Sequence, residues 1–201
     1  GCQNTAVGNS TMRQNQTGDA NTAVGYRALD NNTADNNTAV GIDALRTNTS
    51  GAQNTAVGRL SLDANTTGAE NTATGNSALG ANTTGGNNSA FGSSALVANT
   101  TGARNAAVGI EALSANTTGD DNTAVGQCAL KVNTTSHDNT AVGSYALQDN
   151  TSGTQNTAIG IQAMRYGTTG NYNVALGAFT LGASDVNTGD HNIAIGRKAL
   201  F

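Results

Sequence analysis

The sequence predicts an all-β fold, a parallel β-solenoid (β-roll) built from about twelve 17-residue coils. Three observations predict it. The segment NTAVGQCALKVNTTSHD, residues 122–138, is preceded and followed at a regular 17-residue interval by nearly the same line. This period is too short for a repeat of two helices, whose known periods exceed about 30 residues. Asn and Gly recur at fixed offsets between short apolar words, which is typical of strands separated by turns.

Twelve copies of the repeat N-T-A-V-G-x-x-A-L-x-x-N-T-T-G-x-x follow one another, and we number its columns 1 to 17 from the first Asn. Successive column 5 glycines are separated by a step of 17, except for one step of 16 and one of 19. The missing residue falls near 34–35, and the two additional residues fall near 183–186. We expect residues 1–201 to form a single solenoid domain that is a segment of a longer fibre. The column 5 glycines are Gly8, Gly25, Gly41, Gly58, Gly75, Gly92, Gly109, Gly126, Gly143, Gly160, Gly177 and Gly196.

The composition argues against several classes of protein. Charged residues make up 11% and aromatic residues 3% of the 201 residues, Pro and Trp are absent, and the net charge is −4. Disordered chains are also poor in apolar residues, but they usually carry high net charge or much Pro, Lys or Glu. Because no basic stripe is present to neutralise phosphates, no nucleic-acid partner is expected. No apolar run approaches the ~20 residues that span a bilayer, so no membrane insertion is expected.

Column 1 is Asn in every copy. In a parallel stack each residue lies over its equivalent in the next coil, so this column predicts a ladder of side-chain amides, as stacked Asn forms in cross-β structures. Gly in columns 5 and 15 suits turns that require a positive φ or a close backbone approach. The expected structural ladder consists of Asn4, Asn21, Asn37, Asn54, Asn71, Asn88, Asn105, Asn122, Asn139, Asn156, Asn173 and Asn192.

Side chains alternate between the two faces of a strand. We assign columns 1, 3 and 5 to the interior, with the Leu of column 9 filling the space beside the Ala of column 3. Column 4 then forms an outward apolar stripe, and a stripe of this length usually marks an interface. The opposite assignment, with column 4 inward and Ala outward, remains open. The expected oligomer interface consists of Val7, Val24, Val40, Val57, Phe91, Val108, Val125, Val142, Ile159, Leu176 and Ile195.

Charged residues support the same register. Column 10 of the first four copies alternates in sign, which avoids like-charge repulsion between stacked neighbours. In column 17, Arg104 lies one repeat before Asp121 and is expected to stack on it. The alternating column consists of Arg13, Asp30, Arg46 and Asp63.

No catalytic or cofactor site is expected. The histidines, His137 and His191, lie three coils apart, at roughly 14 Å for the spacing of adjacent strands. No metal-ligand cluster or phosphate-binding loop is recognisable. Asp121 and Asp138 stack as paired carboxylates, as a retaining glycosidase would need, but a solvated turn beside Arg104 explains them better. The sequence therefore predicts a protein that is not an enzyme and has no cofactor or metal.

Two further motifs have structural explanations. Cys2 and Cys128 lie seven coils apart, about 34 Å at the strand spacing, so they cannot bridge within one solenoid. They are free thiols by default, and a bridge between chains remains open. The word N-T-T or N-T-S recurs in column 12 as a formal glycosylation signal, but ladder formation explains these Asn without sugar. The Asn of these signals are Asn65, Asn82, Asn99, Asn116, Asn133 and Asn150.

The words NTAVGYRAL (21–29) and ALGANTTG (78–85) resemble repeats of phage tail-fibre-like proteins and bacterial surface adhesins. They are also similar to the head repeats of trimeric autotransporter adhesins, whose N-S-V-A-I-G word aligns with N-T-A-V-G. The resemblance covers essentially the whole chain, which departs from the autotransporter head in its 17-residue coil and added N-T-T-G word. It implies a left-handed β-roll, commonly trimeric, that acts as a stalk or attachment surface.

Ice binding is the alternative from another class. The Thr of column 2 stack beside the outward column 4, and columns 13 and 14 form a second Thr array. Against it, column 2 changes to Ser89, Ala106, Val174 and Ile193, whereas the Ala of column 3 never changes. The candidate ice-binding ladder consists of Thr5, Thr22, Thr38, Thr55, Thr72, Thr123, Thr140 and Thr157.

These observations together predict a non-enzymatic fibrous module of an extracellular, cell-surface or virion-surface attachment protein. Its expected partner is itself, as a parallel homotrimer or fibre packed along column 4. A host-surface glycan or protein receptor would contact the variable columns 6, 7, 10, 16 and 17. Tyrosines stand out among these variable positions, although they also suit a role in covering turns: Tyr26, Tyr145, Tyr166 and Tyr172.

Overall fold

The computed structural model describes residues 1–182 and 189–200. The expected insertion near 183–186 lies outside the described residues. The chain is all-β: twelve short strands form one parallel sheet in chain order, and the described residues contain no helix. The predicted β-solenoid is thereby confirmed. The strands are β1 (Thr5–Val7), β2 (Thr22–Val24), β3 (Thr38–Val40), β4 (Thr55–Val57), β5 (Thr72–Thr74), β6 (Ser89–Phe91), β7 (Ala106–Val108), β8 (Thr123–Val125), β9 (Thr140–Val142), β10 (Thr157–Ile159), β11 (Val174–Leu176) and β12 (Ile193–Ile195).

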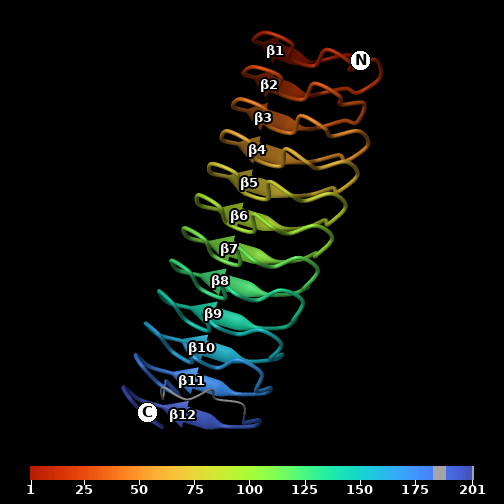
Figure 1. Cartoon of the computed structure of the whole chain (residues 1–201). Coiled ribbons are helices and arrows are strands. Elements are labelled where there is room, and N and C mark those ends of the chain that lie inside the picture. The colour runs from red at the N-terminus through yellow and green to blue at the C-terminus, as the bar shows by residue number, and fades with distance from the viewer. Residues whose placement is uncertain (183–188, 201) are drawn as a thin grey trace.

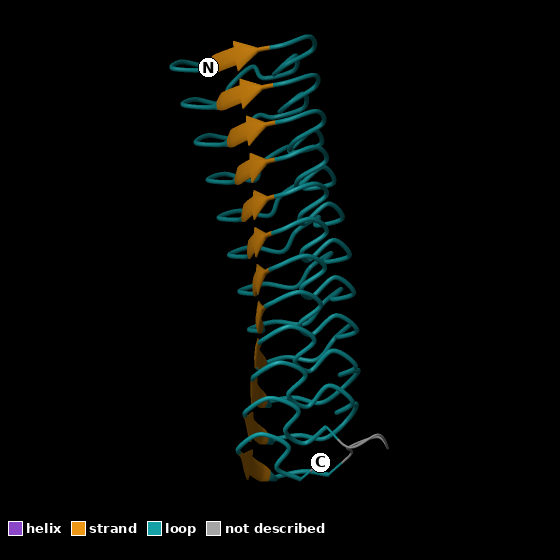
Figure 2. Cartoon of the chain, turned by 90° about the vertical axis from the view of Figure 1, so that its left-hand side faces the viewer, coloured by secondary structure: helices purple, strands orange, loops and turns teal. Residues whose placement is uncertain are grey.

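Each strand pairs with the equivalent residues of the next strand. Even across the 16-residue step the register is kept, with Thr22 opposite Thr38 and Val24 opposite Val40. The missing residue is therefore absorbed in the turn. Each coil lies on the previous one, and loops extend on both sides of the strand column (Figure 1). The direction of the strands turns gradually from β1 to β12 (Figure 2), as the twist of β-strands requires.

The interior is built from small and large apolar side chains in separate columns. The Ala of columns 3 and 8 and the Leu of column 9 are fully buried through the middle of the stack, for example Ala124, Ala129 and Leu130. The column 4 side chain of the same coil, Val125, remains 36% exposed. The outward assignment of column 4 is therefore confirmed, and the alternative with column 4 inward is wrong.

Each coil also places positions other than Gly in the left-handed backbone region, in columns 7, 9 and 17. In one coil these are Cys128, Leu130 and Asp138, with φ of 56°, 51° and 60°. Such angles are especially unfavourable for β-branched side chains. No Val, Ile or Thr occurs in these columns, and this explains why column 9 is Leu or Met while column 4 is mostly Val or Ile.

The two glycine columns serve different purposes. Gly126 in column 5 has a φ of 133°, and a Cβ there would lie 2.5 Å from the carbonyl oxygen of Gly143 in the next coil. Gly102 in column 15 has no unusual φ, but its Cβ would lie 2.5 Å from both the Oδ1 of Asn99 and the oxygen of Gly119. Column 5 therefore needs both conformational freedom and space, whereas column 15 needs space alone.

Candidate interaction surface

The outward side chains of columns 2 and 4 form one continuous surface along β1–β12, which we call the strand face. The repeat places a half-buried Thr and an exposed Val in most coils. Neither column contains a charged residue in any of its copies. All expected interface residues lie on this face, and most of them are exposed, whereas Val142 and Leu176 are half-buried.

The threonines of columns 2 and 13 differ in their hydrogen bonding. In column 13, most Thr hydroxyls donate to the carbonyl oxygen of the equivalent Thr in the next coil, for example Thr66 to Thr83 at 3.0 Å and Thr83 to Thr100 at 3.0 Å. The column 2 hydroxyls, such as those of Thr72 and Thr123, have no hydrogen-bond partner within the described chain. The column 2 row therefore leaves its hydroxyls available to solvent or to a ligand.

The strand face is regular except in two places. In β5–β7, column 4 contains Thr74 and Phe91, and column 2 shrinks to Ser89 and then Ala106. In β11 and β12, column 2 becomes apolar, and Ile193 is 70% exposed.

The column 1 Asn side chains tie neighbouring coils together. The Oδ1 of Asn54 accepts hydrogen bonds from the backbone N–H of Asn71 at 3.0 Å and from its Nδ2 at 3.2 Å. That Nδ2 also donates to the oxygen of Gly85 in its own coil at 2.9 Å. A second ladder in column 12 runs alongside, because the Nδ2 of Asn82 donates to the Oδ1 of Asn65 and to the same Gly85 oxygen. These two ladders satisfy polar groups that are fully buried.

The second ladder stops at the tenth coil. Column 12 is Gly167 there, which has no side-chain amide to donate, and the buried Oδ1 of Asn150 is left without a hydrogen-bond partner. Met164 replaces the usual Leu in column 9 of this coil, and its Cε would lie 3.1 Å from a Cβ at Gly167. The longer methionine side chain therefore lies next to the space that the missing Asn leaves.

The formal glycosylation signals are not accessible. Asn65, Asn82 and Asn99 and the later members of the set are fully buried. Their amides are also used in the column 12 ladder. A glycan could not be attached to these side chains in the folded protein.

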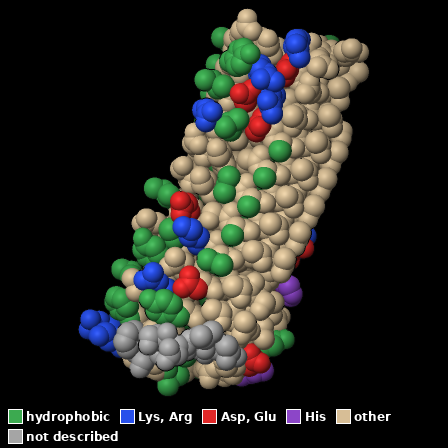
Figure 3. All heavy atoms as spheres, viewed as in Figure 1, with side chains coloured by type: hydrophobic (Ala, Val, Ile, Leu, Met, Phe, Trp, Pro, Cys, Tyr) green, Lys and Arg blue, Asp and Glu red, His purple; other side chains and the backbone are tan. Residues whose placement is uncertain are grey.

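The predicted charge alternation forms ion pairs between coils. Arg13 pairs with Asp30 at 3.1 Å, and Arg46 with Asp63 at 3.0 Å. Acidic and basic side chains lie together along this edge near the N-terminal coils (Figure 3). Burial raises the pKa of the Asp63 carboxyl above its ordinary value, although Arg46 opposes the shift.

Two further pairs lie in the middle of the stack. The guanidinium of Arg104 donates to Asp121 at 2.7 Å, and this hydrogen bond lowers the pKa of the Asp121 carboxyl. Lys131 lies 2.7 Å from Glu111 and lowers the pKa of the Glu111 carboxyl in the same way. Asp121 is therefore paired as the stacking in column 17 predicted.

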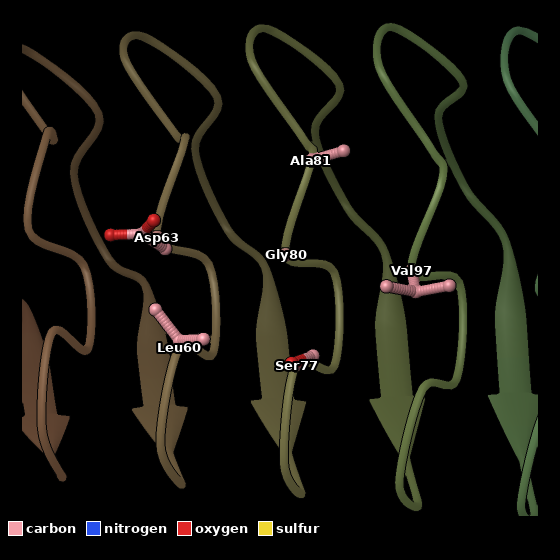
Figure 4. A pocket seen from close by; sticks show the side chains of 6 residues that line it. All are labelled: Leu60, Asp63, Ser77, Gly80, Ala81 and Val97. Carbon is pink, nitrogen blue, oxygen red and sulfur yellow. The ribbon is translucent and has the colours of Figure 1, made fainter.

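A shallow hollow of about 280 Å³ lies where column 10 loses its side chain at Gly80. Asp63 and Val97 occupy the same column on the coils to either side, and Leu60 and Ser77 line the column 7 side (Figure 4). The hollow is a gap in a row of side chains. Only Asp63 and Ser77 contribute polar side chains to its lining.

The tyrosines make contacts within the chain. The guanidinium of Arg165 lies 5.3 Å from the ring centre of Tyr145 and 5.2 Å from that of Tyr166. Tyr172 stacks on His191 with ring centres 4.9 Å apart. The ring centre of Tyr26 lies 5.8 Å from the guanidinium of Arg27. These contacts fit a role in covering turns.

Both cysteines are unpaired; Cys2 is exposed and Cys128 is buried, and burial raises the pKa of the Cys128 thiol. Within residues 1–182 and 189–200, no three His, Cys, Asp or Glu side chains are grouped closely enough to hold a metal ion. In the same part of the chain, no helix has the length and apolarity needed to cross a bilayer.

Comparisons with known proteins give no match: no family model fits the chain, and no curated protein or solved structure is similar to it.

Proposed function

We propose that the chain is a non-enzymatic structural module of an extracellular, cell-surface or virion-surface attachment fibre, and that copies associate in parallel along the strand face as a homotrimer. The observation that carries the proposal is the uncharged, largely apolar strand face, which continues through all twelve coils. Long exposed apolar surfaces on soluble proteins usually mark interfaces.

The size of the strand face supports association. Eleven intervals between strands at about 4.8 Å give a length of about 50 Å. A three-residue strand is about 10 Å wide, so one copy offers about 500 Å². Two copies in contact would bury about 1,000 Å², which is near the lower limit of specific interfaces. In a trimer each copy would contact two neighbours and would bury its apolar columns more completely.

The absence of charge supports a partner that is a second copy of the same chain. In a parallel, in-register assembly every residue lies near its own equivalent, so a charged residue would face a like charge. Columns 2 and 4 contain no charged residue, whereas Arg59 in column 6 and Arg104 in column 17 lie outside them. The charged columns and the tyrosines would remain at the outer surface, where a host glycan or protein receptor could reach them.

Sedimentation equilibrium tests the proposal. We expect the protein to sediment as an assembly of three chains, and the double variant Val125→Asp/Val142→Asp to sediment as a monomer with unchanged β-sheet circular dichroism. The matched control Thr84→Asp/Thr101→Asp adds the same charges at the same spacing on exposed turn positions and should remain assembled. A wild-type protein that stays monomeric at its highest soluble concentration would contradict the proposal.

Ice binding is the second candidate, because the column 2 hydroxyls are unpartnered within the described chain and stand in register beside the column 4 valines. A regular array of free hydroxyls and methyl groups could order water. Thermal hysteresis measured on the monomeric Val125→Asp/Val142→Asp variant and on the wild type separates the two functions. Activity of the wild type that is lost on replacing Thr123 and Thr140 by Lys would favour ice binding.

A further inference from the structure

The strand face is so repetitive that two copies could slide along each other. If the proposed association occurs, on which this inference rests, a shift by one coil would still place the Val column of one copy against the Thr column of the other over most of the length. A unique register therefore needs a place where the repeat is broken on the face itself, as specific pairings need a feature that disfavours the alternatives.

One such place lies in β5–β7. Phe91 is the single aromatic residue of the strand face, and it is 43% exposed. The residues around it are smaller or more polar than the repeat provides. Thr74 replaces Val beside it in column 4, Ser89 lies in its own coil, and Ala106 lies in the next. A large exposed aromatic side chain and smaller neighbouring side chains thus lie together on one surface.

We propose that these four residues, which we call the register key, fix the alignment of neighbouring copies of the chain. The register key consists of Thr74, Ser89, Phe91 and Ala106. In a parallel, in-register assembly, the Phe91 ring of each copy meets the space that Ser89 and Ala106 leave in a neighbouring copy. This arrangement buries the rings without displacing larger side chains.

Slipped registers lose this fit. A shift by one coil brings one of the two Phe91 rings onto Thr72 and Thr74, so an aromatic ring would bury two hydroxyls that have no partner in the described chain. Burying an unpaired hydroxyl is unfavourable. A shift by two or more coils places both rings on coils with Thr in column 2 and Val in column 4, where no small residue leaves space. It also shortens the overlap between the two copies. Because the face turns along the stack (Figure 2), copies held in one register can follow each other's twist.

Disulfide trapping tests the register. In a Cys2→Ser background, chains with Val125→Cys are mixed with chains that carry Thr123→Cys or Thr157→Cys and oxidised, and linked pairs are identified by mass. Positions 123 and 157 are two coils apart in column 2, about 10 Å along the stack, beyond the ~7 Å reach of a disulfide. We expect 125–123 links, with 125–157 links below a tenth of their yield.

Levelling the key should remove this selectivity. The levelled variant restores the common repeat at all four positions, so it is expected to fold and associate: Thr74→Val, Ser89→Thr, Phe91→Val and Ala106→Thr. Its 125–157 links should rise at least fivefold while sedimentation still shows the assembly.

Moving the key gives a positive control. On the levelled chain the key is rebuilt two coils earlier by Val40→Thr, Thr55→Ser, Val57→Phe and Thr72→Ala. This moved-key chain carries Val125→Cys and is mixed with a chain that has the natural key and carries Thr157→Cys. Mixed pairs should then link position 125 of the moved-key chain to position 157 of the natural-key chain.

The outcomes separate this inference from the proposed function. A wild-type protein that remains monomeric overturns both. An assembly whose levelled variant keeps its selectivity, or whose natural key links 125 to 157 as readily as to 123, overturns the register key alone. An assembly without 125–123 links is not aligned as proposed and also overturns it.

Discussion

Two Thr rows of this solenoid, in columns 2 and 13, show how one residue type can serve opposite purposes. In column 13, the hydroxyl of Thr83 donates to a backbone oxygen of the next coil. In column 2 of the same coil, the hydroxyl of Thr72 has no partner within the described chain. The column 13 row stabilises the stack, whereas the column 2 row leaves its hydroxyls available at the surface. Residue type alone does not distinguish the two rows; the position of the next coil's carbonyl does.

The contrast extends to the whole repeat. Columns that hold the coils together use their polar groups internally, as the Asn ladders do, and their side chains are buried. The strand face has no charge and few internal bonds. Substitutions should therefore divide sharply between those that unfold the stack and those that change only its surface.

The largest effect is expected from breaking a ladder. Asn116→Ala removes hydrogen bonds from its Nδ2 to the Oδ1 of Asn99 and to the oxygen of Gly119, and it leaves the Nδ2 of Asn133 without its ladder partner. Because these groups are buried, we expect a loss of about 3 kcal/mol in the free energy of unfolding. Urea denaturation measures it. The control Thr123→Ala on the strand face should change stability by no more than about 0.5 kcal/mol.

A smaller effect should separate the two Thr rows within one coil. Thr83→Val removes one hydrogen bond and is expected to cost about 1 kcal/mol. Thr72→Val changes a hydroxyl without a partner in the described chain and should leave stability within about 0.5 kcal/mol of the wild type. Equal losses in matched denaturation curves would mean that the column 2 hydroxyls also support the fold.

The interrupted ladder offers a stabilising change of similar size. Gly167→Asn supplies a donor for the buried Oδ1 of Asn150, and it should be combined with Met164→Leu because the Met164 Cε lies near the new Cβ. We expect the double variant to gain about 1 kcal/mol. Gly167→Ala/Met164→Leu is the control, since it adds the Cβ without the amide. If both double variants gain the same free energy of unfolding, the gain comes from the backbone change at Gly167 and not from the new side-chain amide.

The sequence was sufficient for the fold because period and column identity depend on stacking alone. The outward position of Val125 and the pairing of Arg104 with Asp121 follow from strand alternation and register. The left-handed backbone of column 9 was not predicted, although the use of Leu130 and its equivalents in place of Val or Ile was a usable signal. The fate of each Thr row could not be predicted, because it depends on distances to the next coil that no column pattern contains.

The smallest effects concern two carboxyls that burial and pairing shift in opposite directions from the ordinary pKa of 3.8. The pKa of Asp63 is raised by burial, so its contribution to stability is present at low pH and is lost as the pH rises through the raised value. The pKa of Asp121 is lowered by Arg104, so its contribution is present above 3.8 and is lost as the pH falls through the lowered value.

Carboxyl NMR titration measures both groups in one sample, with Asp63 expected to titrate above 3.8 and Asp121 below it. Arg104→Gln should return the pKa of Asp121 toward its ordinary value. Arg46→Gln should move the pKa of Asp63 further from its ordinary value, because burial then acts without the opposing charge. Both substitutions remove an arginine partner, and both should raise the pKa of the carboxyl: that of Asp121 from below 3.8 and that of Asp63 from above it. A downward shift of the Asp63 pKa in Arg46→Gln would show that Arg46 does not lower that pKa.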